Sequence, residues 1–316
     1  MAEIGKATRD GAGEGFLELA GERPEVVVLT GDLAGSTRGD KFEKIFPEKF
    51  INMGISEQDM IGTAVGLSLA GKIPFVCSFS CFVLCRAYDQ IRVSLCYNNA
   101  NVKIIGTHSG ITVGPDGATA QMLEDIAIMR VLPNMKVIVP ADAAQAKKAV
   151  KASADIPGPV FIRAGRGPVP VVTKEEDLYE FGKAQIFSEG DDVTIVACGI
   201  MVNEALEAAE ILKAGGVSAG VINMHTVKPL DEDALRRAAG KSGAVVTAEE
   251  HQIYGGLGSS VAEFLSGTDA VPMEMVGIGN VFGESGKPDE LKEKYGLTSQ
   301  KIIEACNKVL RRKTKS

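Results

Sequence analysis

The sequence predicts an α/β protein of two domains, each built on a mostly parallel sheet flanked by helices. Three observations lead to this fold class. The chain has 316 residues, which suits two domains better than one. Short apolar runs alternate with longer helical stretches, as expected of a parallel sheet covered on both faces. The alternation stops once, at a Gly- and Pro-rich stretch over 164–170, and then begins again.

The first predicted domain covers residues 1–170. Its strands are short runs of mainly apolar residues, and the stretches between them are rich in Ala, Leu, Ile and Met, which favour helix. We expect strands at 26–30, 73–77, 102–106, 135–139 and 160–163. We expect helices at 58–70, 82–96, 121–130 and 143–152. A glycine-rich loop, residues 108–117, follows the third strand.

The second predicted domain covers residues 191–316, after a connection at 171–190 that is mainly polar. The same alternation of apolar runs and helical stretches returns there. We expect strands at 193–197, 218–223, 244–247 and 272–276, and helices at 202–214, 231–239, 259–265 and 299–311. No internal repeat or low-complexity tract is visible.

Charge and composition exclude several classes of protein. A net charge of −7 leaves no basic stripe for nucleic acid. No apolar run reaches membrane-spanning length, and the first residues do not form a signal peptide. The six cysteines lack metal-site spacing and are interpreted as reduced thiols, as expected in the cytoplasm. We therefore expect a cytoplasmic protein with no metal site of its own.

Chemically useful side chains gather where predicted strands end. In open α/β sheets, ligands bind at the carboxyl ends of the strands. Six candidate residues occupy such ends or the loops that follow them: Asp32, Ser36, Phe79, His108, Asp116 and Arg163. Together they predict a single site in the first domain, without naming a reaction.

Glu57 is the carboxylate of greatest interest, because it opens the helix predicted at 58–70. Ser56 is placed to cap that helix, and a carboxylate in the first turn suits the helix dipole. In isolation, a helix-start carboxylate is the ordinary interpretation. A functional role requires Glu57 to face an apolar cleft.

Five ordered motifs resemble those of the transketolase superfamily. They are Gly-Ile-Ser-Glu-Gln at 54–58, Ser-Phe-Ser-Cys-Phe at 78–82 with the run at 86–92, the glycine-rich stretch over 106–119, Leu-Pro-Asn-Met at 132–135 and Val-Pro-Ala-Asp at 139–142. Each motif alone is weak, but their order covers essentially the whole chain. The resemblance implies a pyrimidine-binding domain followed by a transketolase C-terminal domain.

The resemblance implies roles in thiamine diphosphate chemistry. Glu57 matches the glutamate that activates the cofactor, whose carboxyl donates a hydrogen bond to the aminopyrimidine ring. Burial in an apolar pocket would raise the pKa of such a carboxyl and let it hold the proton. Phe79 and Phe82 match the aromatic wall against that ring, although aromatics at this spacing are more often ordinary core. Asp32 matches a residue near the cofactor.

The same resemblance implies a substrate site for sugar phosphates. Residues at four positions match the phosphate-binding set of the family: Arg9, Ser36, His108 and Arg163. Forked, charge-assisted donors are what a phosphate needs, although arginines are more commonly solvated surface charges. Asp116 matches a residue that contacts a substrate hydroxyl.

One essential part of the family's site is missing from the chain. The family binds the diphosphate and its divalent metal, Mg²⁺ or Ca²⁺, through a Gly-Asp-Gly motif followed by Asn, and this sequence has none. We therefore expect an N-terminal partner subunit that supplies this motif, in an α2β2 heterotetramer with two sites.

The sequence does not identify the donor substrate. The family usually has His in the run Gly117-Ala118-Thr119-Ala120-Gln121, and here Ala120 stands in its place. The leading hypothesis is transfer of a two-carbon ketol unit between sugar phosphates. The alternatives are a related enzyme for an unusual ketose, the β-subunit of a 2-oxoacid dehydrogenase, and an inert regulatory or scaffold subunit.

Overall fold

The first domain is built on a seven-stranded sheet in the order β12-β6-β7-β5-β4-β2-β3. In the computed structural model of the chain, which describes residues 3–268 and 270–313, all pairings in this sheet are parallel except that of β12 with β6. The strands are β2 (Val26–Thr30), β3 (Phe50–Asn52), β4 (Ile73–Phe79), β5 (Lys103–Thr107), β6 (Lys136–Ile138), β7 (Val160–Arg163) and β12 (Thr226–Lys228). The predicted fold class is confirmed.

Helices cover both faces of this sheet, because successive residues of a strand point to opposite faces. Val26 and Val28 of β2 pack in one apolar cluster with helices α1 and α8, and Val27 and Leu29 pack in the other with α4, α5 and α7. The helices of the domain are α1 (Thr8–Glu22), α2 (Ala34–Thr37), α3 (Asp40–Ile45), α4 (Glu57–Leu69), α5 (Ser80–Arg86), α6 (Tyr88–Gln90), α7 (Asp125–Arg130) and α8 (Ala143–Ser153).

Two helical predictions differ from the structure. The single helix expected at 82–96 is divided into α5, α6 and a π-helical stretch at Ile91–Tyr97. The helix expected at 121–130 begins only at Asp125, because Gln121 and Met122 instead extend along the glycine-rich loop, where Ser109 bridges to Met122. Periodicity of apolar residues identifies helical segments but does not locate such breaks.

Helix α1 is absent from the sequence predictions because it is rich in glycine, which disfavours helix. Its glycines permit close packing instead. A Cβ at Gly11 would lie 2.0 Å from the carbonyl oxygen of Ala143 in α8, so only glycine fits there. This close approach anchors the first turn of α1, which carries Arg9.

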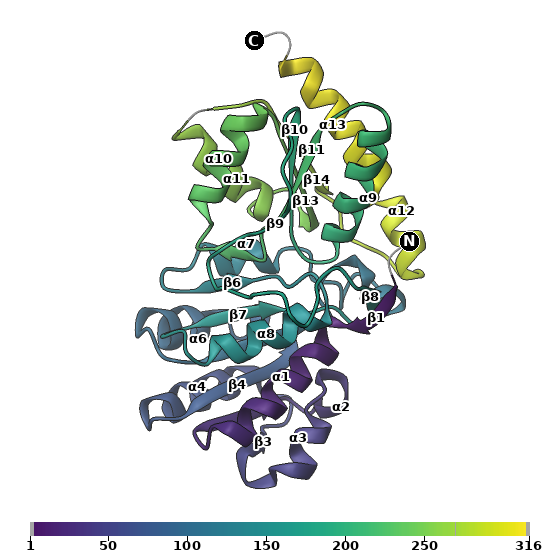
Figure 1. The fold of residues 1–316 in the computed structure, drawn as a ribbon. Coiled ribbons are helices and arrows are strands. Elements are labelled where there is room, and N and C mark those ends of the chain that lie inside the picture. Colours follow the sequence, from purple (N-terminus) through teal and green to yellow (C-terminus); the bar gives the residue numbers. More distant parts are fainter. Residues whose placement is uncertain (1–2, 269, 314–316) are drawn as a thin grey trace.

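The second domain has a five-stranded sheet in the order β14-β13-β10-β11-β9, in which β9 alone is antiparallel. Figure 1 shows α10 and α11 on one side of this sheet and α9 and α13 on the other. The elements are β9 (Gln185–Ser188), β10 (Val193–Ala197), α9 (Met201–Ala214), β11 (Ala219–Asn223), α10 (Glu232–Ser242), β13 (Val245–Gln252), α11 (Leu257–Ser266), β14 (Met273–Ile278), α12 (Pro288–Lys294) and α13 (Ser299–Lys313).

The two domains share structural elements. Strand β9 lies within the stretch 171–190, and β12, which follows β11 of the second sheet, pairs with β6 at the edge of the first. Near the amino terminus, β1 (Ile4–Ala7) pairs with β8 (Pro168–Pro170), beside the second domain in Figure 1. Within the described residues, no helix combines the length and apolar character needed to cross a membrane.

Candidate functional site

The register of the first sheet brings the predicted residues to one edge. Phe79 pairs with Thr107, and Gly106 pairs with Arg163, so β4, β5 and β7 end side by side. Asp32 follows β2 at the same edge and adopts a positive φ of 61°. The carboxyl ends of four adjacent strands, β7, β5, β4 and β2, therefore lie along one edge of the sheet.

Glu57 begins α4 and is 4% exposed, so it is not a solvated helix-start carboxylate. Its Oε1 accepts a hydrogen bond from Nη1 of Arg86 at 2.7 Å. The predicted cap is wrong: the Ser56 side chain accepts no helix N–H, and its Oγ donates to the carbonyl of Met53 at 2.8 Å. The start of α4 thus holds a buried carboxylate that is paired with Arg86.

An aromatic surface lies beside this carboxylate. The rings of Phe79 and Phe82 are stacked, with centroids 5.3 Å apart, and both side chains are only partly buried. The His108 ring stacks on Phe79 at 3.6 Å, and the Arg86 guanidinium lies over Phe82 at 4.2 Å. These side chains form an aromatic surface against which a planar ring could pack.

Arg9 contacts both Ser36 and His108. Arg9 Nη1 donates to the Ser36 carbonyl at 2.9 Å and lies 3.3 Å from His108 Nε2. Because a guanidinium only donates, His108 Nε2 accepts, and its proton resides on Nδ1, which faces Thr107 Oγ1 at 3.1 Å. Arg9 Nε is buried and has no hydrogen-bond partner among the described residues. This buried donor is therefore unsatisfied.

Two arginines that the sequence patterns did not single out complete the cluster. Burial, followed by the charges of Arg9, Arg166 and Arg38, lowers the pKa of His108 from 6.5 to about 3. These three arginines and His108 form what we call the cationic cluster. The signal for Arg166 is its place three residues beyond the end of β7, within the Gly- and Pro-rich stretch at 164–170.

Arg163 does not join the cationic cluster. Its Nε donates to Asp125 at 2.8 Å, its Nη2 donates to the Glu250 carbonyl at 2.9 Å, and its Nη1 lies 3.4 Å from the Glu250 carboxylate. The side chain is 6% exposed. All three nitrogens thus face protein acceptors, and the structure gives this residue a place between the two domains.

Asp116 lies at the end of the glycine-rich loop, where Arg166 Nη1 donates to it at 3.1 Å. Asp32 is exposed, and its Oδ1 accepts from Asn52 at 3.4 Å. Ala120 is partly buried just beyond the loop. Asp32 and Asp116 thus lie in segments that follow strands β2 and β5 of the first sheet, and both are exposed.

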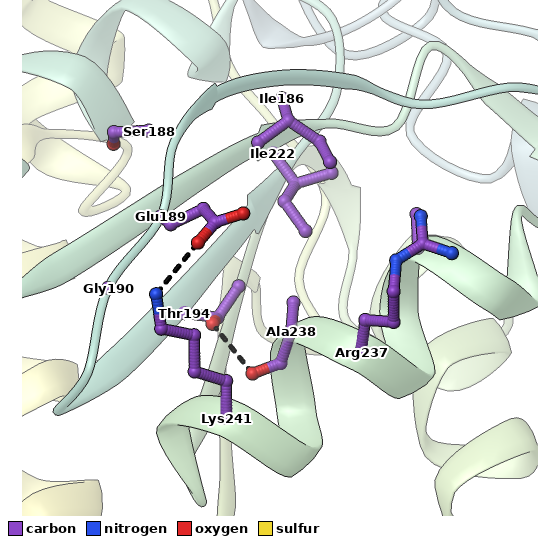
Figure 2. Close-up of a pocket in the computed structure, with 10 residues that line it drawn as sticks. Ile186, Ser188, Glu189, Gly190, Thr194, Ile222, Arg237, Ala238 and Lys241 are labelled. Atoms are coloured by element: carbon purple, nitrogen blue, oxygen red, sulfur yellow. Dashed lines mark hydrogen bonds and ion pairs between the residues drawn. The ribbon is translucent and has the colours of Figure 1, made fainter.

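A separate cavity of about 230 Å³ lies in the second domain (Figure 2). Ile186, Ile222 and Ala238 contribute to its apolar lining, and Lys241 at its rim donates to Glu189 at 2.7 Å. None of the predicted site residues lines it. The cationic cluster and the Glu57 cleft therefore stand apart from this cavity.

Comparisons with known proteins agree with this arrangement. Residues 5–171 match the model of the transketolase pyrimidine binding domain, and residues 182–302 match that of the transketolase C-terminal domain. The chain is 45% identical to a 6-deoxy-6-sulfo-D-fructose transketolase subunit from Clostridium sp. (strain MSTE9), covering 94% of this chain and 92% of that one. It is 39% identical to an apulose-4-phosphate transketolase subunit from Phocaeicola vulgatus, covering 97% and 98%.

A solved structure described as a split gene transketolase, inactive beta4 tetramer, superimposes with a TM-score of 0.92. The two sequences are 51% identical, and the match covers 98% of this chain and 100% of that one. Transketolase from Campylobacter jejuni shares the fold, with a TM-score of 0.82, and this chain covers 46% of it. The two matched domains, their order and these relatives lead to one conclusion: the chain belongs to the transketolase family.

Proposed function

We propose that this chain is the C-terminal subunit of a two-subunit transketolase, which transfers a two-carbon ketol unit between sugar phosphates and is active only with an N-terminal partner. The observation that carries the proposal is the meeting of two features at one sheet edge. The buried Glu57 carboxylate lies beside an aromatic surface, and the cationic cluster lies on the other side of Phe79.

The residues present fit the pyrimidine half of thiamine diphosphate. That cofactor supplies a carbanion at its thiazolium C2 when bound. Glu57 would supply the carboxyl that hydrogen-bonds the aminopyrimidine ring. Phe79 and Phe82 offer partly exposed aromatic surface for that ring, next to the His108 ring and the Arg86 guanidinium that already stack on them. Asp32 would lie near the cofactor, at the positive-φ turn after β2.

The cationic cluster suits a terminal phosphate of a sugar. Arg9 Nε is buried without a partner, and Arg9 Nη1, Ser36 and His108 meet around it. Charge-assisted bonds from a guanidinium are among the strongest that bind phosphate. A 2-oxo acid has no distal phosphate, so the cluster disfavours a dehydrogenase β-subunit. We assign Arg166 to this role in place of Arg163, whose donors are occupied.

The remaining parts of the site would come from the partner. We place the Gly-Asp-Gly motif and the ligands of Mg²⁺ or Ca²⁺ on the N-terminal subunit. Within the described residues, 3–268 and 270–313, no group of three or more His, Cys, Asp or Glu side chains is arranged to hold a metal ion. The relative described as a split gene transketolase supports a divided enzyme, and we propose an α2β2 assembly with two sites.

Ala120 favours a second candidate donor. An alanine can neither accept nor donate a proton at a position where the family uses His, and it leaves more room. One relative is named for 6-deoxy-6-sulfo-D-fructose, a ketose with an anionic end that the cationic cluster could also bind. Asp116 would contact a donor hydroxyl in either case.

The test is ketol transfer in a mixture of this chain with the N-terminal subunit, thiamine diphosphate and Mg²⁺. Xylulose 5-phosphate and 6-deoxy-6-sulfofructose serve as alternative donors, with ribose 5-phosphate as a trial acceptor. We expect transfer in the mixture and none with either subunit alone. An assembled mixture without transfer from any ketose would overturn the proposal and leave the scaffold alternative.

A further inference from the structure

Three consecutive residues at the end of β13, Glu249, Glu250 and His251, are almost fully buried between the domains. Each accepts a backbone N–H. Glu249 accepts from Leu257 and Gly258 at the start of α11, and His251 Nε2 accepts from Ala127 in α7. No chemical role for this run follows from the sequence. Its members instead each fix a different element in place.

Glu250 differs from its neighbours because it contacts the glycine-rich loop. Its Oε1 accepts the backbone N–H of Thr112 at 2.8 Å. A Cβ at Gly110 would lie 2.2 Å from the Glu250 carboxyl carbon, so the carboxylate packs directly on the Gly110 backbone. The loop meets the second domain at this carboxylate, and Arg163 holds the carboxylate from the β7 side.

The glycine-rich loop depends on such outside contacts. Four of its residues, His108, Gly110, Gly114 and Gly117, have positive φ, and its helical stretch at Ile111–Asp116 is broken at Gly114. Backbone of this kind forms few regular hydrogen bonds and takes its shape from what surrounds it.

Gln121 makes a second attachment at the far end of the loop. Its Nε2 lies within hydrogen-bond distance of the carbonyls of Ile111, Gly114 and Glu284, at 3.2, 3.3 and 2.9 Å. Glu284 belongs to the second domain. The attachments at Thr112 and Gln121, together with the close approach of Gly114 and Gly117 to residues 285–288, hold the segment that carries Asp116 next to Arg166.

We propose that Glu250 is a positioning residue, through which the second domain holds the glycine-rich loop so that Asp116 and Arg166 meet the sugar substrate. The substrate part of this inference rests on the proposed function. The positioning part rests on the contacts of Glu250 alone and can be measured without any substrate.

Hydrogen exchange on the full chain tests the positioning part. Glu250→Ala removes the acceptor of the Thr112 N–H, and we expect peptides from 109–117 to exchange at least about tenfold faster. Glu249→Ala is the matched control, equally buried and adjacent but bonded to α11. Loop exchange that is unchanged in Glu250→Ala, or equally raised in Glu249→Ala, would overturn the inference. Glu250→Gln keeps an acceptor oxygen and provides a milder variant, with an intermediate effect expected, should the alanine variant not fold.

Steady-state kinetics of the reconstituted complex test the substrate part. For Glu250→Ala we expect the donor KM to rise about tenfold with a smaller change in kcat, and partial recovery in Glu250→Gln. Kinetics equal to those of the wild type, with a loosened loop, would contradict it. If the wild-type complex itself shows no ketol transfer, the proposed function fails, while the exchange experiment still decides the role of Glu250.

Discussion

Arg86 donates a hydrogen bond from Nη1 to Oε1 of the buried Glu57, at 2.7 Å. The arginine side chain is half exposed, whereas the glutamate is 4% exposed. The guanidinium also lies over the ring of Phe82. Arg86 therefore shields the buried carboxylate on its open side, at the place where a cofactor ring would have to approach it.

Replacing Arg86 with Met should tighten cofactor binding in the assembled enzyme by a few fold. A guanidinium only donates, so Oε1 is occupied as an acceptor, and the pair must open before that oxygen can serve a ring nitrogen. A partly exposed pair of this kind is worth about 0.2–1 kcal/mol. Calorimetric titration with thiamine diphosphate measures the effect, with Arg92→Met as the control because Arg92 is exposed nearby. Weaker binding in Arg86→Met would show that the arginine supports the cofactor instead.

His108 should remain neutral throughout the physiological pH range. Burial and the surrounding arginines lower its pKa from 6.5 to about 3, so His108 takes up its proton at a lower pH in the folded chain than in the unfolded chain. The contribution of neutral His108 to the free energy of unfolding is fully present above about pH 6.5, and it is lost as the pH falls towards 3. Imidazole NMR signals of the folded chain should show the Nδ1–H tautomer and no titration of His108 from pH 5 to 8. A midpoint inside that range would contradict the assigned environment.

Arg166 and Arg163 should give opposite phenotypes. Arg166→Met removes an exposed-side donor of the cationic cluster, so KM for phosphorylated sugars should rise about tenfold or more, with stability nearly unchanged. Arg163→Met leaves Asp125 and Glu250 buried without their cation, which should lower the free energy of unfolding by about 3–5 kcal/mol. Denaturant unfolding and steady-state kinetics separate the two. Similar effects from both variants would remove the distinction between them.

Ala120→His should change donor preference. A histidine restores a proton-accepting and proton-donating group next to Asp116 and fills space beyond the loop. If Ala120 is a specificity device, xylulose 5-phosphate should become a better donor relative to 6-deoxy-6-sulfofructose, seen as a ratio of kcat/KM values. Ala120→Asn is a control for size. An unchanged ratio would mean that donor choice is made elsewhere in the site.

Sequence patterns indicate those site residues whose positions follow from where each strand ends along the chain. Phe79 and His108 follow apolar runs, and the rule for parallel sheets then places them at one edge. Arg163 ends such a run too, but its orientation between Asp125 and Glu250 depends on the second domain, which no local pattern describes. Arg166 was overlooked because it lies in a Gly- and Pro-rich stretch.

Long-range packing explains the remaining differences in the fold. Strand β12 is three residues long and joins the sheet of the other domain, so alternation of apolar residues could not reveal it. Helix α1 is favoured by its contact with α8, where Gly11 admits the Ala143 carbonyl, and this packing outweighs the low helix propensity of glycine.

Glu57 of this chain is expected to act in a site that the N-terminal subunit completes. The most direct measurement compares ketol transfer by that subunit when it is titrated with the wild-type chain or with Glu57→Gln. Both chains should assemble equally, judged by sedimentation, because Gln has the size of Glu and its amide oxygen can still accept from Arg86. Turnover should appear only on mixing, and it should fall at least about 100-fold with Glu57→Gln, since the amide cannot hold the carboxyl proton. Equal turnover with the two chains would contradict the account.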